Sequence, residues 1–155
     1  RAEPDKLRAR GRAALETLAA LPQVDAGRLA AIGFCFGGSV VLELARAGAD
    51  LKAVVSFHGV LTTKLPAQPG QVKASVLVCT GVDDPLAPPE QVADFESEMR
   101  IGGVKDWQII AYGNTLHGFT NPAADGSMLR TAMYSEQADR RSWASMKSLF
   151  DEVLT

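Results

Sequence analysis

The stretch LAAIGFCFGG, residues Leu29–Gly38, decides the fold of this chain. Its first part, Leu29–Phe34, is a short apolar run bounded by turn residues, which is typical of a buried strand. It leads directly into Phe36–Ala47, an apolar segment that stops at Gly48, and glycine commonly ends a helix. The sequence therefore predicts a strand, a tight turn and a helix, with Cys35 on the turn.

Alternating strands and helices continue on both sides of this unit. The patterns predict further strands over Leu51–Phe57, Ser75–Thr80 and Trp107–Tyr112, and further helices from Pro4 to Pro22, about Pro89 to Met99 and about Glu136 to Leu154. Four strands alternating with four helices predict an α/β fold in three layers, α/β/α, with a mostly parallel sheet. Ligands bind such sheets at the carboxyl ends of the strands, so we expect the site just after Phe34, Phe57, Thr80 and Tyr112.

The bulk composition argues against several classes of protein. The chain has 155 residues, of which 46% are hydrophobic, and this fits one domain with a substantial core. The 16 basic and 18 acidic residues form no block of one sign, so we expect no nucleic-acid partner. No apolar run approaches the roughly 20 residues of a membrane-spanning helix, so we expect no membrane partner. The sequence contains no CxxC, HExxH, GxGxxG or GxxxxGK motif, and we therefore expect neither a metal nor a bound cofactor.

The turn that carries Cys35 has the spacing of a nucleophile elbow. Gly33 and Gly37 flank the cysteine in a GxCxG arrangement, where small neighbours allow the strand and the helix to approach closely. The N-terminus of the following helix favours a thiolate at Cys35. The backbone N–H of Phe36 is in position to donate to an oxyanion. A lone cysteine in a glycine-rich turn is more often a buried packing residue, so the assignment depends on further residues.

Those residues follow the two later strands. Asp83 and Asp84 come after Ser75–Thr80, and His117 comes after Trp107–Tyr112. Each therefore lies at the carboxyl edge of the predicted sheet, and the order nucleophile, acid, histidine is that of α/β-hydrolases. The residues alone leave Asp83 and Asp84 as alternative acids.

Three motifs, GFCFGG at 33–38, DDPLAPPE at 83–90 and HGFTNP at 117–122, resemble the dienelactone hydrolase family over about Pro4 to Leu154. In that family the acid is followed four residues later by proline, which implies Asp84 with Pro88. The resemblance implies that His117 takes the thiol proton, Cys35 attacks an ester or lactone carbonyl, and Asp84 orients the imidazole. Water then hydrolyses the acyl-enzyme.

Three further residues are candidates for substrate binding: His58, Phe119 and Asn121. His58 follows the strand Leu51–Phe57, although a loop histidine that bonds its own neighbourhood is the more common case. Asn121 stands where dienelactone hydrolases carry an arginine for the substrate carboxylate. The resemblance therefore implies a small-molecule ester or lactone substrate rather than the anionic dienelactone itself. Cys79 lies within an apolar strand, and we interpret it as a core residue.

In an α/β-hydrolase several strands precede the nucleophile, whereas Cys35 follows a single predicted helix. We therefore expect residues 1–155 to be the C-terminal part of one α/β-hydrolase domain, without the N-terminal strands and the loop that donates the second oxyanion N–H. The strand Leu29–Phe34 then has a free apolar edge, along which we expect self-association or pairing with an N-terminal fragment. We expect a cytoplasmic location for the parent protein.

Three other functions remain open at this point. A redox sensor uses an exposed, low-pKa cysteine but needs neither a histidine nor an acid. A non-catalytic interaction module binds through the free sheet edge and hydrolyses nothing. An acyltransferase with the same triad differs from a hydrolase only in the group that accepts the acyl chain.

Overall fold

The computed structural model describes residues 3–155, which form four strands and four helices that alternate except between the second and third strands, where a loop without a helix makes the connection. The elements are α1 (Pro4–Ala19), β1 (Ala30–Phe34), α2 (Phe36–Arg46), β2 (Ala53–Phe57), β3 (Ser75–Gly81), α3 (Pro89–Ile101), β4 (Trp107–Tyr112) and α4 (Glu136–Val153). Every element expected from the sequence is present. The ends differ by one to three residues, the largest difference being α1, which ends at Ala19 rather than at Pro22.

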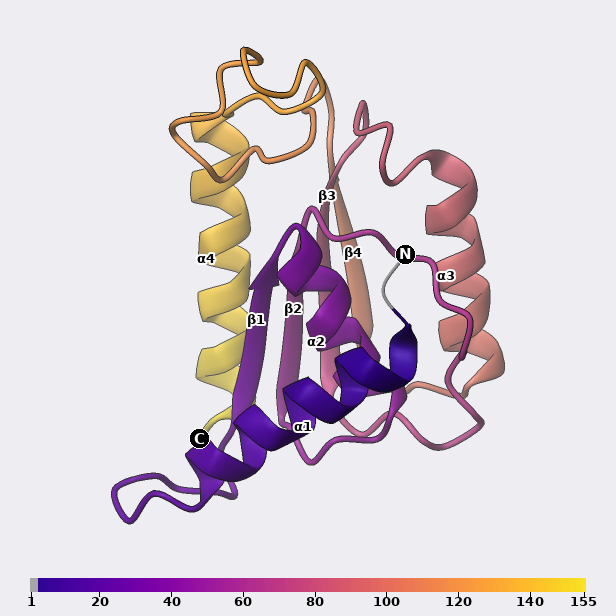
Figure 1. Ribbon diagram of the computed structural model, residues 1–155, viewed down its shortest axis with the longest axis vertical. Helices are drawn as coiled ribbons and strands as arrows, with labels where there is room; N and C mark the ends of the chain where they lie inside the picture. Colours follow the sequence, from indigo (N-terminus) through magenta and orange to yellow (C-terminus); the bar gives the residue numbers. More distant parts are fainter. Residues whose placement is uncertain (1–2) are drawn as a thin grey trace.

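The strands form one parallel sheet in the order β1-β2-β3-β4 (Figure 1). Phe34 pairs with Phe57, and Phe57 pairs with Cys79, so the carboxyl ends of the first three strands lie side by side. This register brings the segments that follow each strand to one edge of the sheet, where the sequence predicts the site.

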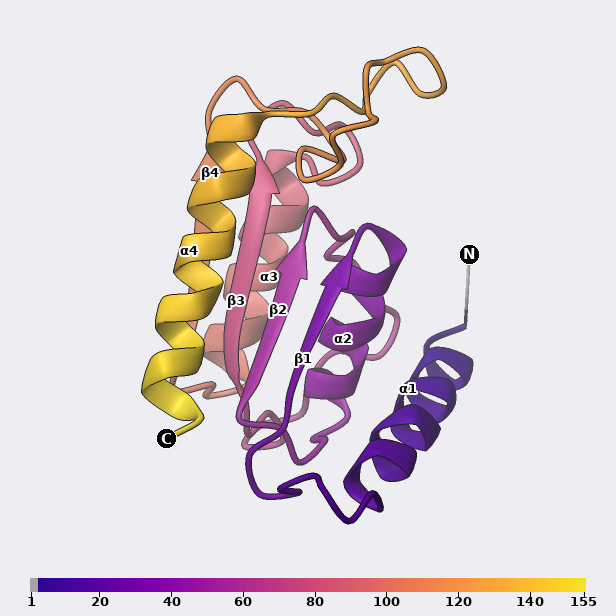
Figure 2. The ribbon, with the colours of Figure 1, turned by 90° about the vertical axis from the view of Figure 1, so that its left-hand side faces the viewer.

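Helices cover both faces of this sheet, which confirms the predicted three-layer α/β/α arrangement. One face packs against α4, and the other packs against α2 and α3, with α1 lying outside α2 (Figure 2). Successive strand residues alternate between the two cores: Val54 belongs to the cluster with α2 and α3, whereas Val55 belongs to the cluster with α4. Burial on both faces explains why these strands read as continuous apolar runs.

A buried ion network holds α2 against α3. Arg46 is 1% exposed, and its guanidinium donates to Glu43 at 3.0 Å, to Glu98 at 2.9 Å and to the backbone oxygen of Leu61 at 2.6 Å. Its charge also lies 5.6 Å from the centre of the Phe95 ring. Because α2 begins at the nucleophile turn, this network fixes the helix on which the site is built.

The outer edge of β1 pairs with no strand among residues 3–155. Ile32 and Phe34 of this strand are 39% and 41% exposed. Trp143 of α4 stacks on the ring of Phe57 in the neighbouring strand and is itself 43% exposed. The free edge therefore exists in the described part of the chain, and the partner expected for it stays a prediction. In the same residues, no helix combines the length and the apolar character that crossing a bilayer requires.

Candidate active site

Cys35 occupies a sharp turn between β1 and α2. Its backbone has φ of 53° and ψ of −119°, a conformation in which residues other than glycine are strained. A Cβ at Gly33 would lie 2.1 Å from the backbone oxygen of Gly37, so glycine is required at position 33. A Cβ at Gly37 would meet no atom within 4 Å, which corrects the expectation that both flanking glycines are needed for close approach. The contact is made by the backbone of residue 37, and a side chain there points into open space.

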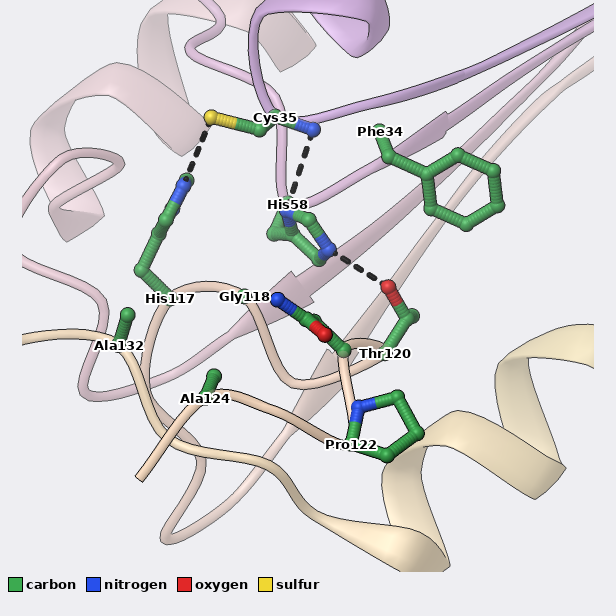
Figure 3. Close-up of a pocket in the computed structure, with 10 residues that line it drawn as sticks. Phe34, Cys35, His58, His117, Gly118, Thr120, Pro122, Ala124 and Ala132 are labelled. Atoms are coloured by element: carbon green, nitrogen blue, oxygen red, sulfur yellow. Dashed lines mark hydrogen bonds between the residues drawn. The ribbon is translucent and has the colours of Figure 1, made fainter. Parts of the chain in front are cut away.

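Three side chains from three different segments form a hydrogen-bonded chain. Cys35 Sγ lies 3.1 Å from His117 Nε2, and His117 Nδ1 lies 2.8 Å from Asp84 Oδ2 (Figure 3 shows the first of these contacts). Asp84 is 1% exposed and His117 is 4% exposed, while Cys35 is exposed. The structure therefore brings together the three residues that the sequence singles out as candidates for nucleophile, base and acid.

The two aspartates after β3 differ in their surroundings. Asp84 is buried, and its second carboxylate oxygen accepts from the backbone N–H of Leu86 at 2.8 Å. Asp83 is exposed to solvent, and only its backbone N–H contacts the histidine loop, at Thr115. Of the two carboxylates, Asp84 alone reaches His117.

The segment from 113 to 135 positions His117. The backbone N–H of His117 donates to Thr131, and its oxygen accepts from the N–H of Met133. This segment also crosses the end of β3, where a Cβ at Gly81 would lie 2.2 Å from the backbone oxygen of Thr115. The close crossing places the histidine loop beside the aspartate loop.

His117 is held in its charged form. The hydrogen bond to Asp84 is the largest influence and raises the pKa of His117 from 6.5 to about 9, with a smaller contribution from Cys35. Burial acts in the opposite direction and is outweighed. At neutral pH the imidazolium thus donates from Nδ1 to the Asp84 carboxylate and presents Nε2–H to the Cys35 sulfur.

A pocket of about 480 Å³ opens over Cys35. Its polar lining comes from Cys35, His58, His117, Thr120 and Asn121, and its apolar lining comes from Phe34, Pro122, Ala124 and Ala132 (Figure 3). Carboxylates are absent from this lining. Among residues 3–155, no group of three His, Cys, Asp or Glu side chains is arranged to hold a metal ion.

His58 lies beneath the nucleophile rather than beside its thiol. Its ring is 3% exposed, its Nδ1 accepts from the backbone N–H of Cys35 at 3.1 Å, and its Nε2 lies 2.8 Å from Thr120 Oγ1. Burial is the main cause that lowers the pKa of His58 to about 4, and the charge on His117 adds to the effect. The ring is therefore neutral at pH 7 and touches the pocket without taking part in the chain from Cys35 to Asp84.

Of the other residues considered in the sequence, some reach the pocket and others lie buried away from its surface. Phe36 is the first residue of α2, where an N–H has no acceptor within its own helix, and its side chain is 59% exposed. Asn121 lines the pocket, and its side-chain oxygen accepts from the N–H of Ala123. The structure does not bring Phe119 to the pocket surface: its ring is fully buried, packed edge-on against His58 at 5.1 Å. Cys79 is fully buried in β3, where burial raises its pKa to about 12.

Sequence reasoning missed Thr120 and the three apolar residues Pro122, Ala124 and Ala132 of the pocket wall. Thr120 lies within the HGFTNP motif three residues after the histidine, so its position was a usable signal. Ala124 and Ala132 carried none, because segment 113–135 has no periodic pattern and its course depends on long-range backbone bonds.

Comparison with known proteins shows which family and which solved structures this chain resembles. The sequence pattern of the dienelactone hydrolase family matches residues 1–154. The solved structure m3DLH is 50% identical and superposes with a TM-score of 0.91, over 97% of this chain and 62% of that one. A dienelactone hydrolase-like promiscuous phosphotriesterase from metagenomic libraries is 46% identical, with a TM-score of 0.89, over 95% of this chain and 61% of that one. The α/β-hydrolase fold expected from the sequence is thereby confirmed.

Relatives among curated proteins differ in length. An uncharacterized protein of Caenorhabditis elegans is 35% identical over 96% of this chain and 94% of its own. A carboxymethylenebutenolidase homolog of Mus musculus is 25% identical over 76% of this chain but only 47% of its own. The chain thus spans about half the length of the carboxymethylenebutenolidase relatives that it matches. The family pattern over nearly the whole chain and the agreement with the sequence motifs lead to one conclusion: the chain belongs to the dienelactone hydrolase family.

Proposed function

We propose that this protein hydrolyses a carboxylic ester or lactone through a Cys35–His117–Asp84 triad and a covalent acyl-thioester. The observation that carries the proposal is the hydrogen-bonded chain from Cys35 Sγ through His117 to Asp84, at the mouth of a pocket. Membership of a hydrolase family and the carboxymethylenebutenolidase relatives support the reaction class.

In the proposed mechanism the Cys35 thiol has passed its proton to His117 Nε2, which lies 3.1 Å from Cys35 Sγ. The Cys35 thiolate attacks the carbonyl carbon, and the carbon–sulfur bond forms as the carbonyl π electrons move onto oxygen. When the tetrahedral intermediate collapses, the carbon–oxygen bond to the alcohol breaks, and His117 Nε2–H protonates the departing oxygen. In the second half, neutral His117 takes a proton from water, hydroxide attacks the thioester, and the Cys35 thiolate leaves.

Asp84 acts through His117 in both halves. Its carboxylate accepts from Nδ1–H, so the other ring nitrogen faces the thiol in either protonation state. The N–H of Phe36, at the first position of α2, is the proposed donor to the oxyanion. The strained backbone of Cys35 supports this role, because the elbow turns the sulfur and the following N–H towards the same space.

The pocket favours an uncharged substrate. Phe34, Pro122 and Ala124 supply apolar wall, and Asn121 stands where the resemblance places an arginine. A carboxylate in the substrate would find no cation there apart from the imidazolium of His117. We therefore propose a neutral small-molecule ester or lactone.

Hydrolysis of p-nitrophenyl butyrate tests the proposal. Wild type is expected to release nitrophenol, Cys35→Ala and His117→Ala are expected to lose turnover, and Cys79→Ala serves as the control that removes the other thiol. Iodoacetamide should modify Cys35 and leave the buried Cys79 unmodified in the folded protein. Hydrolysis that persists in folded Cys35→Ala would reject the triad. Thiol modification without any ester turnover would favour the redox sensor instead.

The 46% identity to a promiscuous phosphotriesterase favours a second candidate reaction at the same sulfur. In that reaction the Cys35 thiolate attacks phosphorus, and a phosphorus–oxygen bond breaks instead of a carbon–oxygen bond. Diethyl p-nitrophenyl phosphate carries the same leaving group as the ester and makes a matched substrate. Turnover of both substrates that is lost together in Cys35→Ala would support one nucleophile for both; no phosphotriester turnover would restrict the function to esters.

A further inference from the structure

His58 connects the nucleophile turn to the loop after His117. Its Nδ1 accepts from the Cys35 backbone N–H at 3.1 Å, and its Nε2 lies 2.8 Å from Thr120 Oγ1 (Figure 3). The ring is held from several sides, because it is 3% exposed and packs edge-on against the rings of His117 and Phe119 at 5.0 and 5.1 Å. Its own backbone is strained, with φ of 42°. A buried, strained histidine with both ring nitrogens engaged has a defined orientation.

The partners of the ring determine where its proton lies. The Cys35 backbone N–H is shared between Phe57 O at 3.0 Å and His58 Nδ1 at 3.1 Å, and because a backbone N–H can only donate, this contact favours the tautomer in which Nδ1 is unprotonated. Burial and the neighbouring charge of His117 lower the pKa of His58 to about 4, although Asp84 acts in the opposite direction. The ring is consequently neutral in the physiological range and carries its single proton on Nε2. That proton is donated to the Thr120 hydroxyl oxygen.

This donation fixes the role of the Thr120 hydroxyl. Since its oxygen accepts from His58, the hydroxyl proton is left to donate to another group. The contact with His58 is the one side-chain hydrogen bond that Thr120 makes within residues 3–155. Thr120 lines the pocket together with Asn121 and the apolar residues Pro122 and Ala124. A donor whose orientation is fixed discriminates between substrates that offer an acceptor to it and those that do not.

We propose that Thr120 is a specificity residue whose hydroxyl donates to an acceptor oxygen of the substrate away from the scissile carbonyl, and that His58 is the positioning residue that makes it a donor. The substrate class is then a neutral ester or lactone with an ether or carbonyl oxygen where a purely alkyl ester has a methylene group. This inference rests on the proposed ester hydrolysis, and it adds the chemistry by which the same pocket selects its substrate.

Two matched substrate pairs test the donor. p-Nitrophenyl methoxyacetate differs from p-nitrophenyl butyrate by one oxygen in the acyl part, and 2-methoxyethyl butyrate differs from butyl butyrate by one oxygen in the alcohol part. The ratio of kcat/KM within a pair, compared between wild type and Thr120→Val, cancels the intrinsic reactivity of each ester. We expect the variant to lower the ratio about 2- to 10-fold in one pair. Thr120→Ser, which keeps the hydroxyl, is expected to restore it.

His58→Phe tests the positioning role, because it keeps a ring of similar shape and removes both hydrogen bonds. A residue that only supports the fold would lower kcat/KM equally for both members of a pair. We expect His58→Phe to lower the kcat/KM ratio within a pair as Thr120→Val does. Combining the two substitutions should lower the ratio no further. An unchanged ratio in both pairs for folded Thr120→Val would overturn the specificity role.

A measurement without turnover separates this inference from the proposed function. In protein labelled with ¹⁵N-histidine, the ring of His58 is expected to carry its proton on Nε2 between pH 6 and 8, and Thr120→Val is expected to shift that resonance. A proton on Nδ1 would overturn the inference whatever the activity. A wild-type protein that hydrolyses none of the four esters would reject the proposed function, and the spectrum would still decide the state of His58.

Discussion

Replacing Asp84 by asparagine removes one charge from the site with almost no change of shape. Asp84 bonds His117 at 2.8 Å and Leu86 N–H at 2.8 Å, and it is 1% exposed, so the side chain has no room to turn away. If the amide oxygen of the asparagine keeps the bond to Leu86, its NH₂ group faces His117 Nδ1. His117 then carries its proton on Nε2 when neutral, and it offers no lone pair to the Cys35 thiol.

The magnitude follows from the pKa of His117. The rise from 6.5 to about 9 corresponds to about 3 kcal/mol of preferential stabilisation of the imidazolium, and Asp84 is its first cause. Asp84→Asn should lower the pKa of His117 from about 9, because it removes the largest cause of the rise while burial continues to act against the charged ring. Loss of this stabilisation together with the wrong tautomer is expected to lower kcat/KM by about 10³- to 10⁴-fold.

The assay combines ester kinetics with an NMR titration of the two histidines, the only ones in the sequence. Asp83→Asn is the matched control, since it removes an exposed carboxylate one residue away. We expect His117 to titrate near 9 in wild type and in the control, and at a clearly lower pH in Asp84→Asn. Wild-type kcat/KM in Asp84→Asn, or an equal loss in Asp83→Asn, would show that Asp84 does not act on His117 as proposed.

Three other predictions concern stability. Gly33→Ala should prevent formation of the turn or unfold the protein, because its Cβ would lie 2.1 Å from the backbone of Gly37. Gly37→Ala, by contrast, should change the free energy of unfolding by less than about 1 kcal/mol. Urea denaturation compares the two variants, and equal effects would contradict the geometry of the turn. Arg46→Met should cost about 3–5 kcal/mol, because Glu98 loses its cation while Glu43 keeps only its ion pair with Arg8. Arg100→Met, at a pair 61% and 37% exposed, should cost about 1 kcal/mol or less by the same assay. Because the pKa of His117 in the folded protein is above its ordinary value, His117 contributes up to about 3 kcal/mol to the free energy of unfolding below pH 6.5, and this contribution is lost as the pH rises to about 9. If the free energy of unfolding of Asp84→Asn depends on pH just as steeply, the dependence comes from other groups.

Local patterns accounted for most of the fold. The strands are buried on both faces, so each reads as an apolar run, and glycine or proline marks most of their ends. The site was predictable for a related reason. Cys35, Asp84 and His117 each follow the carboxyl end of a strand, and a parallel sheet brings such ends together whatever the loops do.

The details that sequence could not supply depend on loop geometry. Whether Asp83 or Asp84 reaches the histidine is decided by which side chain the turn after β3 buries, and the residues alone left both open. The bond from His58 to Thr120 joins residues 62 positions apart, and it depends on how segment 113–135 folds back. Backbone geometry also decides the case of Gly37. The GxCxG pattern predicted that glycine is needed there to avoid a clash, but a Cβ at position 37 would meet no atom within 4 Å.

The most direct test of the central claim is to trap the acyl-enzyme. Wild-type protein is mixed with p-nitrophenyl butyrate, quenched within the first turnover, and analysed by intact mass and peptide mapping. We expect one butyryl group per chain, carried by the peptide that contains Cys35, and none in His117→Ala. An acyl group on any other residue, or steady turnover with no adduct at any quench time, would contradict covalent catalysis by Cys35.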